Sequence, residues 1–198
     1  MPATVAAQGR PRRAEVDTNI IDAALVEMKS KGLTHLTLEA VAVRAGVGRP
    51  TVYRRYRNKE ELVRAVLMAK VPNLSIQKTD DPVEDLISMA VTFAHDLDKS
   101  GLMSIAISAH TEARHNPVMA EALKTDYLLP RNTSIVESIQ RAISSDDLVP
   151  VEPDTVRDLL FGPLIYRLLI VGDNVTSAGL RELAETAMSG IRTTKKRP

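Results

Sequence analysis

Apolar residues recur at intervals of three and four along almost the whole chain, which is the period of helices that bury one face. The first such stretch covers residues 14–31, where Val16, Ile20, Ala24 and Met28 form one row. No segment shows the strict alternation of apolar and polar residues that is typical of a half-buried strand. The pattern therefore predicts an all-α protein with about nine helices.

The stretch from residue 36 to residue 62 contains the shortest predicted helices. Thr37 is a candidate N-cap, because its hydroxyl can accept a hydrogen bond from an unpaired backbone N–H of the first turn. One apolar face follows it at helical spacing, made by Leu38, Val41, Ala42 and Ala45. These residues predict a short amphipathic helix that ends before Gly46.

A tight turn and a second short helix come next. Gly46 occupies the left-handed position that often ends a helix, Val47 is expected to enter the core, and Gly48 can cap the next helix. Pro50 is tolerated in a first turn, where its missing N–H has no partner. The second helix is rich in arginine and tyrosine: Arg49, Thr51, Tyr53, Arg54, Arg55, Tyr56 and Arg57. Residues 37–56 therefore predict a helix-turn-helix.

The rest of the chain predicts a helical body. Asn58 and Glu61 resemble a capping box before a helix at 59–70, and Asp81 with Pro82 begins a helix that reaches about residue 99. Further helices are expected at 102–115, at 117–145 with a start, kink or break at Pro130, at 153–171 with a kink at Gly162-Pro163, and at 176–191. The expected organisation is a disordered basic arm at 1–13, a DNA-binding domain at 14–72, a helical domain at 73–192 and a basic tail at 193–198.

Charge is unevenly distributed although the net charge is only +1. Residues 1–59 hold 11 Lys and Arg against 5 Asp and Glu, whereas residues 60–198 hold 15 against 20. This asymmetry indicates a polyanion-binding N-terminal part and a mildly acidic body. There is no cysteine, which excludes disulfides and thiol chemistry, and no long apolar run, so we expect a soluble, cytoplasmic protein.

Residues 14–70 resemble the TetR family of bacterial transcriptional regulators. The resemblance lies in Ile21-Asp22-Ala23-Ala24, in Thr37 and Ala42, in Ala45-Gly46-Val47, and in Thr51-Val52-Tyr53 with Tyr56, Lys59, Glu60 and Leu62. The rest of the chain is similar only in architecture. The resemblance implies a variable helical ligand-binding domain, whose last two long helices form a four-helix bundle in a dimer.

Three positions depart from the family's usual residues. Gly48 stands where a serine is common and loses the capping hydroxyl. Arg55 replaces a frequent histidine, which adds charge, and Ala40 replaces an acidic residue, which removes a capping box. These departures weaken the transfer of base contacts and leave the family resemblance intact.

The resemblance and the chemistry of each side chain assign roles on DNA. Arg49 and Arg54 are candidates for base edges, because a guanidinium can bridge guanine O6 and N7, and Pro50 and Thr51 can touch a thymine methyl. Phosphate contacts are implied for Thr37, Tyr53, Tyr56 and Lys59, helped by the positive ends of helices. The predicted DNA contacts also include Arg44, Gly48 and the arm residues Arg10, Arg12 and Arg13. Each single arginine could instead point into solvent. Arg44, Arg55 and Arg57 are expected either to face the DNA backbone or to be solvated.

One helix reads only a few base pairs, so specificity favours a homodimer on a palindromic operator. The predicted dimer interface comprises Phe161, Leu164, Ile165, Leu168, Leu183 and Ala187, although these residues could simply form the core. Family analogy further implies an effector pocket lined by Met89, Phe93, Met103, Ile107, His110, Thr111, Arg114, Tyr127 and Tyr166. Met and Phe at helical spacing are more often core than ligand contacts.

An enzyme is the least favoured class. His110, Glu112 and His115 are close in sequence, but further ligands for a metal are missing, and we expect no metal and no cofactor. No phosphate-binding loop, GxSxG motif or nucleophilic cysteine is present. Beside a ligand-responsive repressor, two readings stay open. One is a regulator or architectural protein that binds DNA without a small-molecule response; the other is a small-molecule binding module with vestigial DNA binding.

Overall fold

The computed structural model describes residues 9–193 except residues 75, 173 and 174. Over these residues the chain is helical, with no strand beyond an isolated bridge between Leu148 and Arg192. The helices are α1 (Gly9–Lys31), α2 (Leu38–Arg44), α3 (Arg49–Tyr53), α4 (Lys59–Lys70), α5 (Pro82–Lys99), α6 (Leu102–Ala113), α7 (Pro117–Leu123), α8 (Leu129–Ser144), α9 (Pro153–Tyr166) and α10 (Ser177–Ser189). The predicted all-α fold is confirmed, with ten α-helices in the described part instead of nine.

Two short π-helical segments explain part of this difference. Segment η1 (Lys124–Leu128) lies between α7 and α8, and segment η2 (Arg167–Val171) follows α9. The region predicted as one helix at 117–145 is thus helical from residue 117 to residue 144 with a π-helical segment inside it, and Pro130 follows directly after that segment. Pro163 lies inside α9, and the backbone widens to η2 four residues later.

Helix α1 begins earlier than predicted. Residues 9–13, assigned to a disordered arm, are helical in the structure, and residues 1–8 lie outside the described part. Pro11 is compatible with this start because it falls within the first turn. The basic tail predicted at 193–198 lies outside the described residues beyond Thr193.

The chain divides into two compact units. Unit 1 comprises residues 1–70 and 105–123, and unit 2 comprises residues 71–104 and 124–198. The predicted domain boundary near residue 72 stays a prediction, but packing adds residues 105–123 to the unit that contains the helix-turn-helix. One reason is that the side-chain amide of Asn116 donates to Glu60 of α4 over 2.9 Å.

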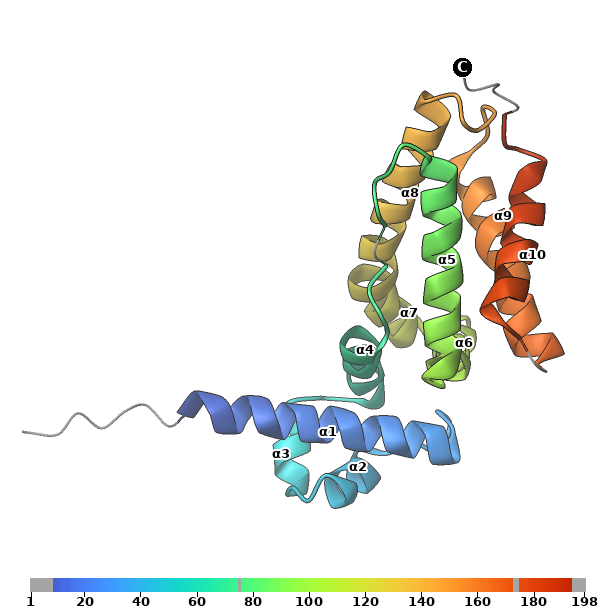
Figure 1. The fold of residues 1–198 in the computed structure, drawn as a ribbon. Coiled ribbons are helices and arrows are strands. Elements are labelled where there is room, and N and C mark those ends of the chain that lie inside the picture. The colour runs from blue at the N-terminus through green and yellow to red at the C-terminus, as the bar shows by residue number, and fades with distance from the viewer. Residues whose placement is uncertain (1–8, 75, 173–174, 194–198) are drawn as a thin grey trace, which may run out of the picture. The chain divides into compact units, whose positions relative to one another are not determined.

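Each unit has its own core. In unit 1, α1 packs against α2 and α4, α2 packs against α3, and α4 packs against α7. The fully buried side chains here include Ile20, Val41, Val52, Leu62, Val66 and Met119. In unit 2, α5, α8, α9 and α10 lie side by side and enclose Leu86, Ile139, Leu160, Leu164 and Leu180 (Figure 1).

Candidate nucleic-acid interface

The turn between α2 and α3 has the geometry that its residues predict. The Thr37 hydroxyl accepts a hydrogen bond from the Ala40 N–H over 3.2 Å, which caps α2. Gly46 adopts a φ of 66°, a left-handed conformation that strains any residue with a Cβ. Val47 follows half-buried rather than fully buried, and its N–H donates to the Ala42 carbonyl. This turn fixes the direction in which α3 leaves α2.

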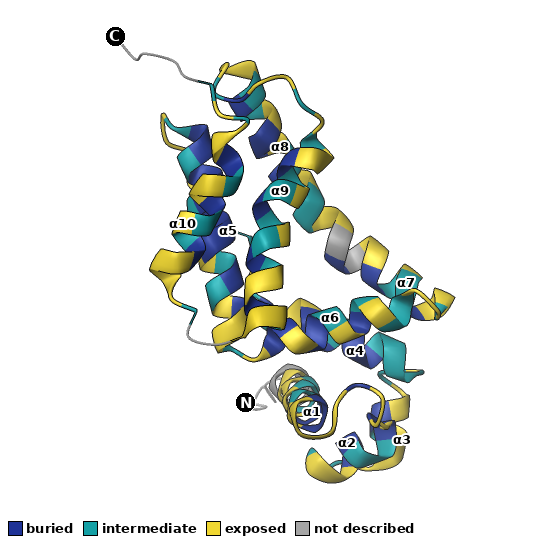
Figure 2. Ribbon diagram, turned by 90° about the vertical axis from the view of Figure 1, so that its right-hand side faces the viewer, coloured by how far each residue is buried: buried dark blue, intermediate teal, exposed yellow. Residues whose placement is uncertain are grey.

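Helix α3 buries one residue and exposes most of the others. Val52 is fully buried and anchors the helix to the core of unit 1. Arg49, Pro50, Tyr53 and the following Arg54 are exposed. Figure 2 colours the ribbon by burial and shows exposed parts of the chain around α3. Gly48 caps the helix without a side-chain hydrogen bond, and Pro50 lies in its first turn, as the sequence predicts. A short helix held by one apolar residue therefore presents arginine and tyrosine to its surroundings.

Buried and half-buried ion pairs hold this helix pair against α1. Glu27 of α1 is almost fully buried and lies 2.8 Å from the Lys31 ammonium and 2.6 Å from the Arg44 guanidinium. Hydrogen bonds from Lys31 and then Arg44 lower the pKa of Glu27 below its ordinary value. Arg44 was predicted to contact DNA, but its guanidinium is already bound to Glu27. Glu27 lies on the buried face of α1, and a buried carboxylate needs a positively charged partner. This was the sequence feature that could have predicted the pairing with Arg44.

Arg55 also differs from its expected role. Its side chain is only 15% exposed, and its Nε atom donates to the carboxylate of Asp17 in α1. Nη1 also contacts the Thr51 carbonyl over 3.3 Å. The expectation that Arg55 faces the DNA backbone or solvent is therefore wrong, because this ion pair ties the end of α3 to α1. Arg57 is exposed, as expected.

Two of the predicted phosphate contacts already have partners. The Tyr53 hydroxyl donates a hydrogen bond to Glu39 of α2, and this bond raises the pKa of Tyr53 and lowers that of Glu39. Lys59, in the first turn of α4, lies 2.8 Å from Glu112, and its side chain is 25% exposed. Tyr56 is half-buried, and burial raises the pKa of its phenol. Tyr53 is exposed, whereas Tyr56 and Lys59 are half-buried, and the phosphate contacts of all three stay predictions.

The start of α4 is fixed by side-chain capping. Asn58 Oδ1 accepts a hydrogen bond from the Glu61 N–H over 2.8 Å. The Glu61 carboxylate reaches back as predicted, but it accepts from the Arg57 N–H over 2.8 Å instead of from Asn58. Arg10, Arg12 and Arg13 lie on the helical backbone of α1, and their side chains lie outside the described part.

Family models match both parts of the chain. The model described as "Tetracyclin repressor-like, C-terminal domain" matches residues 76–187, more than half of the chain, and "Bacterial regulatory proteins, tetR family" matches residues 20–66. The chain belongs to the TetR family. Together with the helix-turn-helix, this membership makes the chain a DNA-binding transcriptional regulator and confirms the family resemblance seen in the sequence.

Relatives of this TetR-family regulator match either most of the chain or a shorter part of it. The HTH-type transcriptional regulator YdeS of Bacillus subtilis is 27% identical over 94% of this chain and 95% of its own. SrpR of Pseudomonas putida is 37% identical over 67 residues, which are 34% of this chain and 32% of its own. A crystal structure of a TetR-family regulator from Mesorhizobium loti has the same fold, with a TM-score of 0.69, 20% identity and coverage of 91% of this chain and 96% of that one.

The predicted effector-pocket residues belong to both compact units of the chain. Phe93 and Tyr127 line a cavity of about 460 Å³ in unit 2, whereas Ile107 and Thr111 line a cavity of about 700 Å³ in unit 1. Met89 and Met103 are buried, and His110 contacts the Ala106 carbonyl of its own helix over 2.6 Å. Arg114 and Tyr166 are exposed. The effector pocket over these nine residues stays a prediction, because helical spacing does not tell which unit a side chain belongs to.

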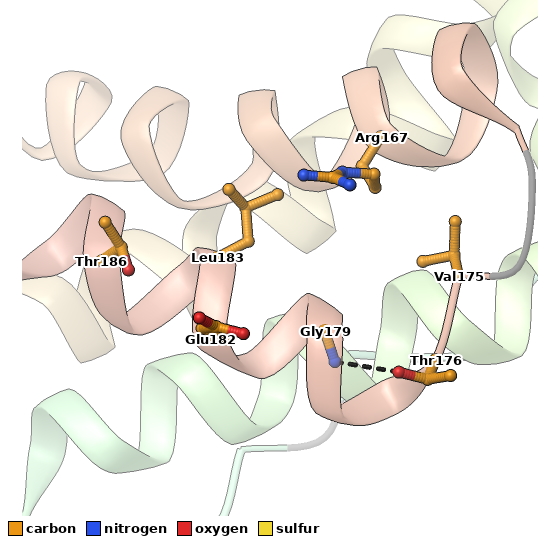
Figure 3. A pocket seen from close by; sticks show the side chains of 7 residues that line it. All are labelled: Arg167, Val175, Thr176, Gly179, Glu182, Leu183 and Thr186. Carbon is orange, nitrogen blue, oxygen red and sulfur yellow. Dashed lines mark hydrogen bonds between the residues drawn. The ribbon is translucent and has the colours of Figure 1, made fainter.

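The predicted dimer residues also separate into two groups. Leu164 and Leu168 are buried in the core of the single chain, so they cannot form an interface, and the prediction is wrong for both. Phe161 and Ile165 are half-buried and line the cavity of unit 2. Leu183 and Ala187 are half-buried on α10. Leu183 lines a pocket of about 290 Å³ between η2 and α10, where Arg167 and Glu182 also lie (Figure 3).

Other predicted features can be located as well. Among the described residues, no three His, Asp or Glu side chains are grouped so that they could hold a metal ion. Glu112, which was considered as a ligand, is paired with Lys59. Within the same part of the chain, no helix has the length and apolar character needed to cross a membrane.

Proposed function

We propose that this TetR-family regulator is a ligand-responsive, homodimeric repressor that binds a palindromic operator. The exposed face of α3 carries this proposal. Val52 holds the helix from one side, which leaves Arg49, Pro50 and Arg54 exposed at the start and end of the helix. A helix of this kind in the major groove places its N-terminal side chains on base edges.

The proposed contacts divide into base readers and phosphate clamps. Arg49 and Arg54 take guanine edges, and Pro50 and Thr51 lie against thymine methyl groups. The phosphate contacts come from Thr37, Tyr53, Tyr56 and Lys59, with backbone approach at Gly48. Arg10, Arg12 and Arg13 add charge along the phosphates from the start of α1. Arg44 stays in this set, because its side chain is 42% exposed although it is paired with Glu27.

Two-fold symmetry supplies the second half-site. The interface that we propose uses the outer faces of α9 and α10, with Ile165, Leu183 and Ala187 retained from the sequence prediction. Tyr166 and Ile170 join them because they are 58% and 69% exposed despite their apolar surfaces. Closing this face against a second copy places two α3 helices on one DNA site.

The remaining parts of the proposal concern the cell. We propose that the protein acts in the cytoplasm, because a regulator of bacterial genes reaches its operator there. We propose no catalytic role and no cofactor. Repression follows from steric exclusion when a dimer occupies an operator. An effector would release it only by binding the DNA-free arrangement more tightly than the DNA-bound one.

Selection of bound genomic fragments, followed by titration over operator variants, tests the proposal. We expect a palindromic site. Arg49→Ala should lose about 1–3 kcal/mol of discrimination at one base step, whereas Tyr53→Phe should weaken binding to all sequences equally. Lys99→Ala removes one exposed positive charge from α5 of unit 2 and serves as the charge-matched control. Equal losses at every base for Arg49→Ala would contradict the base-reading role, and an asymmetric site would contradict the homodimer.

A further inference from the structure

The cavity of unit 2 has the size and walls of a small-molecule site. Its volume of about 460 Å³ falls within the usual range for ligand pockets. Phe93 of α5 and Phe161 of α9 meet edge to face, with ring centroids 6.3 Å apart, and Ile135 and Ile165 add aliphatic walls. Most of this lining is apolar, so the body of a ligand held here must be apolar as well.

The lining also contains Arg131 of α8. Its Nη1 atom donates to the Tyr127 carbonyl over 3.1 Å, and its Nη2 atom lies 3.5 Å from the Val71 carbonyl. The centre of the guanidinium lies 4.2 Å from the centroid of the Tyr127 ring. The Nε atom is buried and has no hydrogen-bond partner in the structure. Carbonyls and an aromatic ring solvate this cation, and among the side chains that the structure describes no carboxylate is paired with it.

The other half-buried arginines of unit 2 are all paired with carboxylates. Arg141 binds Asp85, Arg157 binds Asp154 and Asp158, and Arg181 binds Glu84 and Glu185. Among the described side chains, Arg131 is the half-buried arginine of this unit without a carboxylate. A buried or half-buried charge without a counter-ion is costly, so its presence beside a cavity points to an anion from outside the chain.

The remaining polar groups of the cavity do not supply that anion. Asp158 lies in the lining but is largely exposed and bound to Arg157 at 3.0 Å. Burial raises the pKa of Tyr127, so its phenol stays neutral near pH 7. Asn132 is neutral and offers hydrogen bonds of either kind. The described lining therefore carries one uncompensated positive charge in an apolar surround.

We propose that this cavity binds an amphipathic organic anion, a small molecule with one carboxylate and an apolar aliphatic or aromatic body. The carboxylate binds the Nη atoms of Arg131, each of which has a second N–H beyond the one that faces a carbonyl, and the body lies against Phe93, Phe161 and Ile165. The inference rests on the proposed ligand response, because it names the chemical class of the effector. A neutral analogue of the same shape leaves the guanidinium unpaired and binds more weakly.

Calorimetry on the full-length chain tests the class of ligand. The probes are octanoate and phenylacetate, each compared with its amide, which has the same shape and no charge. We expect at least one carboxylate to bind at least tenfold more tightly than its amide. Arg131→Gln should remove that preference, while Arg167→Gln, which removes an exposed arginine of the same unit outside the cavity, should leave it unchanged. Equal binding of acid and amide, or no binding of either acid, would overturn the proposal.

A second variant guards against a fold effect of the first. Gly162 lies in the wall of the cavity, and a Cβ added there meets no atom within 4 Å. Gly162→Leu should therefore keep the fold, improve the helix and reduce carboxylate binding at least tenfold by occupying space. Unchanged carboxylate binding by this variant would contradict the proposal. If the variant also changes the proportion of monomer and dimer, a second copy of the chain occupies the cavity instead.

Operator release separates this inference from the proposed function. We expect the bound carboxylate to release operator DNA from the natural chain and not from Arg131→Gln. Binding without release would keep the carboxylate site and remove its role as an effector site. Release by a different small molecule, equal in the natural chain and in Arg131→Gln, would keep the ligand-responsive repressor and overturn the carboxylate site.

Discussion

Tyr53 and Glu39 place a hydrogen-bond donor and a negative charge side by side on the same surface. The Tyr53 hydroxyl, which we assign to a DNA phosphate, donates instead to the Glu39 carboxylate in the absence of DNA. That hydrogen bond lowers the pKa of Glu39, so the carboxylate is ionised at neutral pH. A phosphate approaching Tyr53 therefore meets a negative charge next to the donor that it needs. Glu39 is expected to reduce affinity for every DNA sequence.

Replacing Glu39 by Gln tests this effect at a single residue. The amide keeps a hydrogen-bond acceptor for Tyr53 and removes the charge, so binding to all sequences should tighten by about 0.5–1 kcal/mol, roughly two- to fivefold. The measurement is a DNA titration at two salt concentrations, in which the gain should shrink at the higher one. Glu121→Gln, on exposed α7 surface of the same unit, removes the same charge away from α3 and is the control. Weaker binding by Glu39→Gln would show that the carboxylate helps instead to position Tyr53.

The residues of this surface differ in how far the sequence reveals them. The cap at Thr37 and the left-handed Gly46 depend on neighbours within four residues, so their types alone predict them. The partner of Arg55 is Asp17, which lies 38 positions away, and the pair exists only once α1 crosses α3. The residue type at position 55 does not by itself predict this ion pair. Sequence therefore predicts the turn and misses the ion pair that holds it.

At the scale of elements, Glu27 links two helices of unit 1. Its carboxylate on α1 binds Lys31 of the same helix and Arg44 of α2. The ion pair between Glu27 and Arg44 holds α2 against α1. The turn at Gly46 then fixes the direction of α3 relative to α2. The orientation of the recognition helix thus depends on an ionised group that lies outside the DNA-binding surface.

The lowered pKa of Glu27 predicts how this link responds to acid. In the folded chain the pKa lies below the ordinary value of 4.5, so the contribution to stability is complete above about pH 4.5 and is lost as pH falls through the folded pKa. Glu27→Gln should lower the melting temperature at pH 7, and the difference from the natural chain should shrink below pH 4.5. Glu15→Gln, an exposed change on the same helix, should show no such convergence. Parallel melting curves for Glu27→Gln and the natural chain down to pH 3 would contradict the link.

Helix boundaries follow the same division between local and distant causes. The ends of α2, α4 and α5 are fixed by caps and prolines within the segment, and the sequence predicts them closely. The helical backbone at residues 9–13 and the π-helical segments η1 and η2 have no comparable local signal. The residues that line the cavity are further apart in the sequence, because they come from α5, α8 and α9. Periodicity identifies each apolar face and does not say whether that face meets core or cavity.

On the scale of the whole molecule, the two proposals make different demands on unit 2. A cavity with an unpaired Arg131 needs only one chain, because all of its described lining belongs to that unit. Palindromic recognition needs a second chain, since a single α3 contacts only a few base pairs. The surface available for it is the exposed apolar part of α9, η2 and α10, where Ile170 is the most exposed large aliphatic side chain of unit 2 among the described residues.

A double substitution, Tyr166→Glu and Ile170→Glu, tests that surface. Both side chains are exposed, so the fold of the single chain should be preserved, while four like charges at a two-fold interface should prevent dimerisation. Light scattering at micromolar concentration should show a monomer, and operator affinity should fall by at least tenfold because each α3 then binds alone. Val118→Glu, which changes an exposed apolar residue of α7, should leave both measurements unchanged. A variant that stays dimeric and keeps its operator affinity would move the interface away from α9 and α10, and the half-site spacing of the selected DNA would then have to be explained by another face.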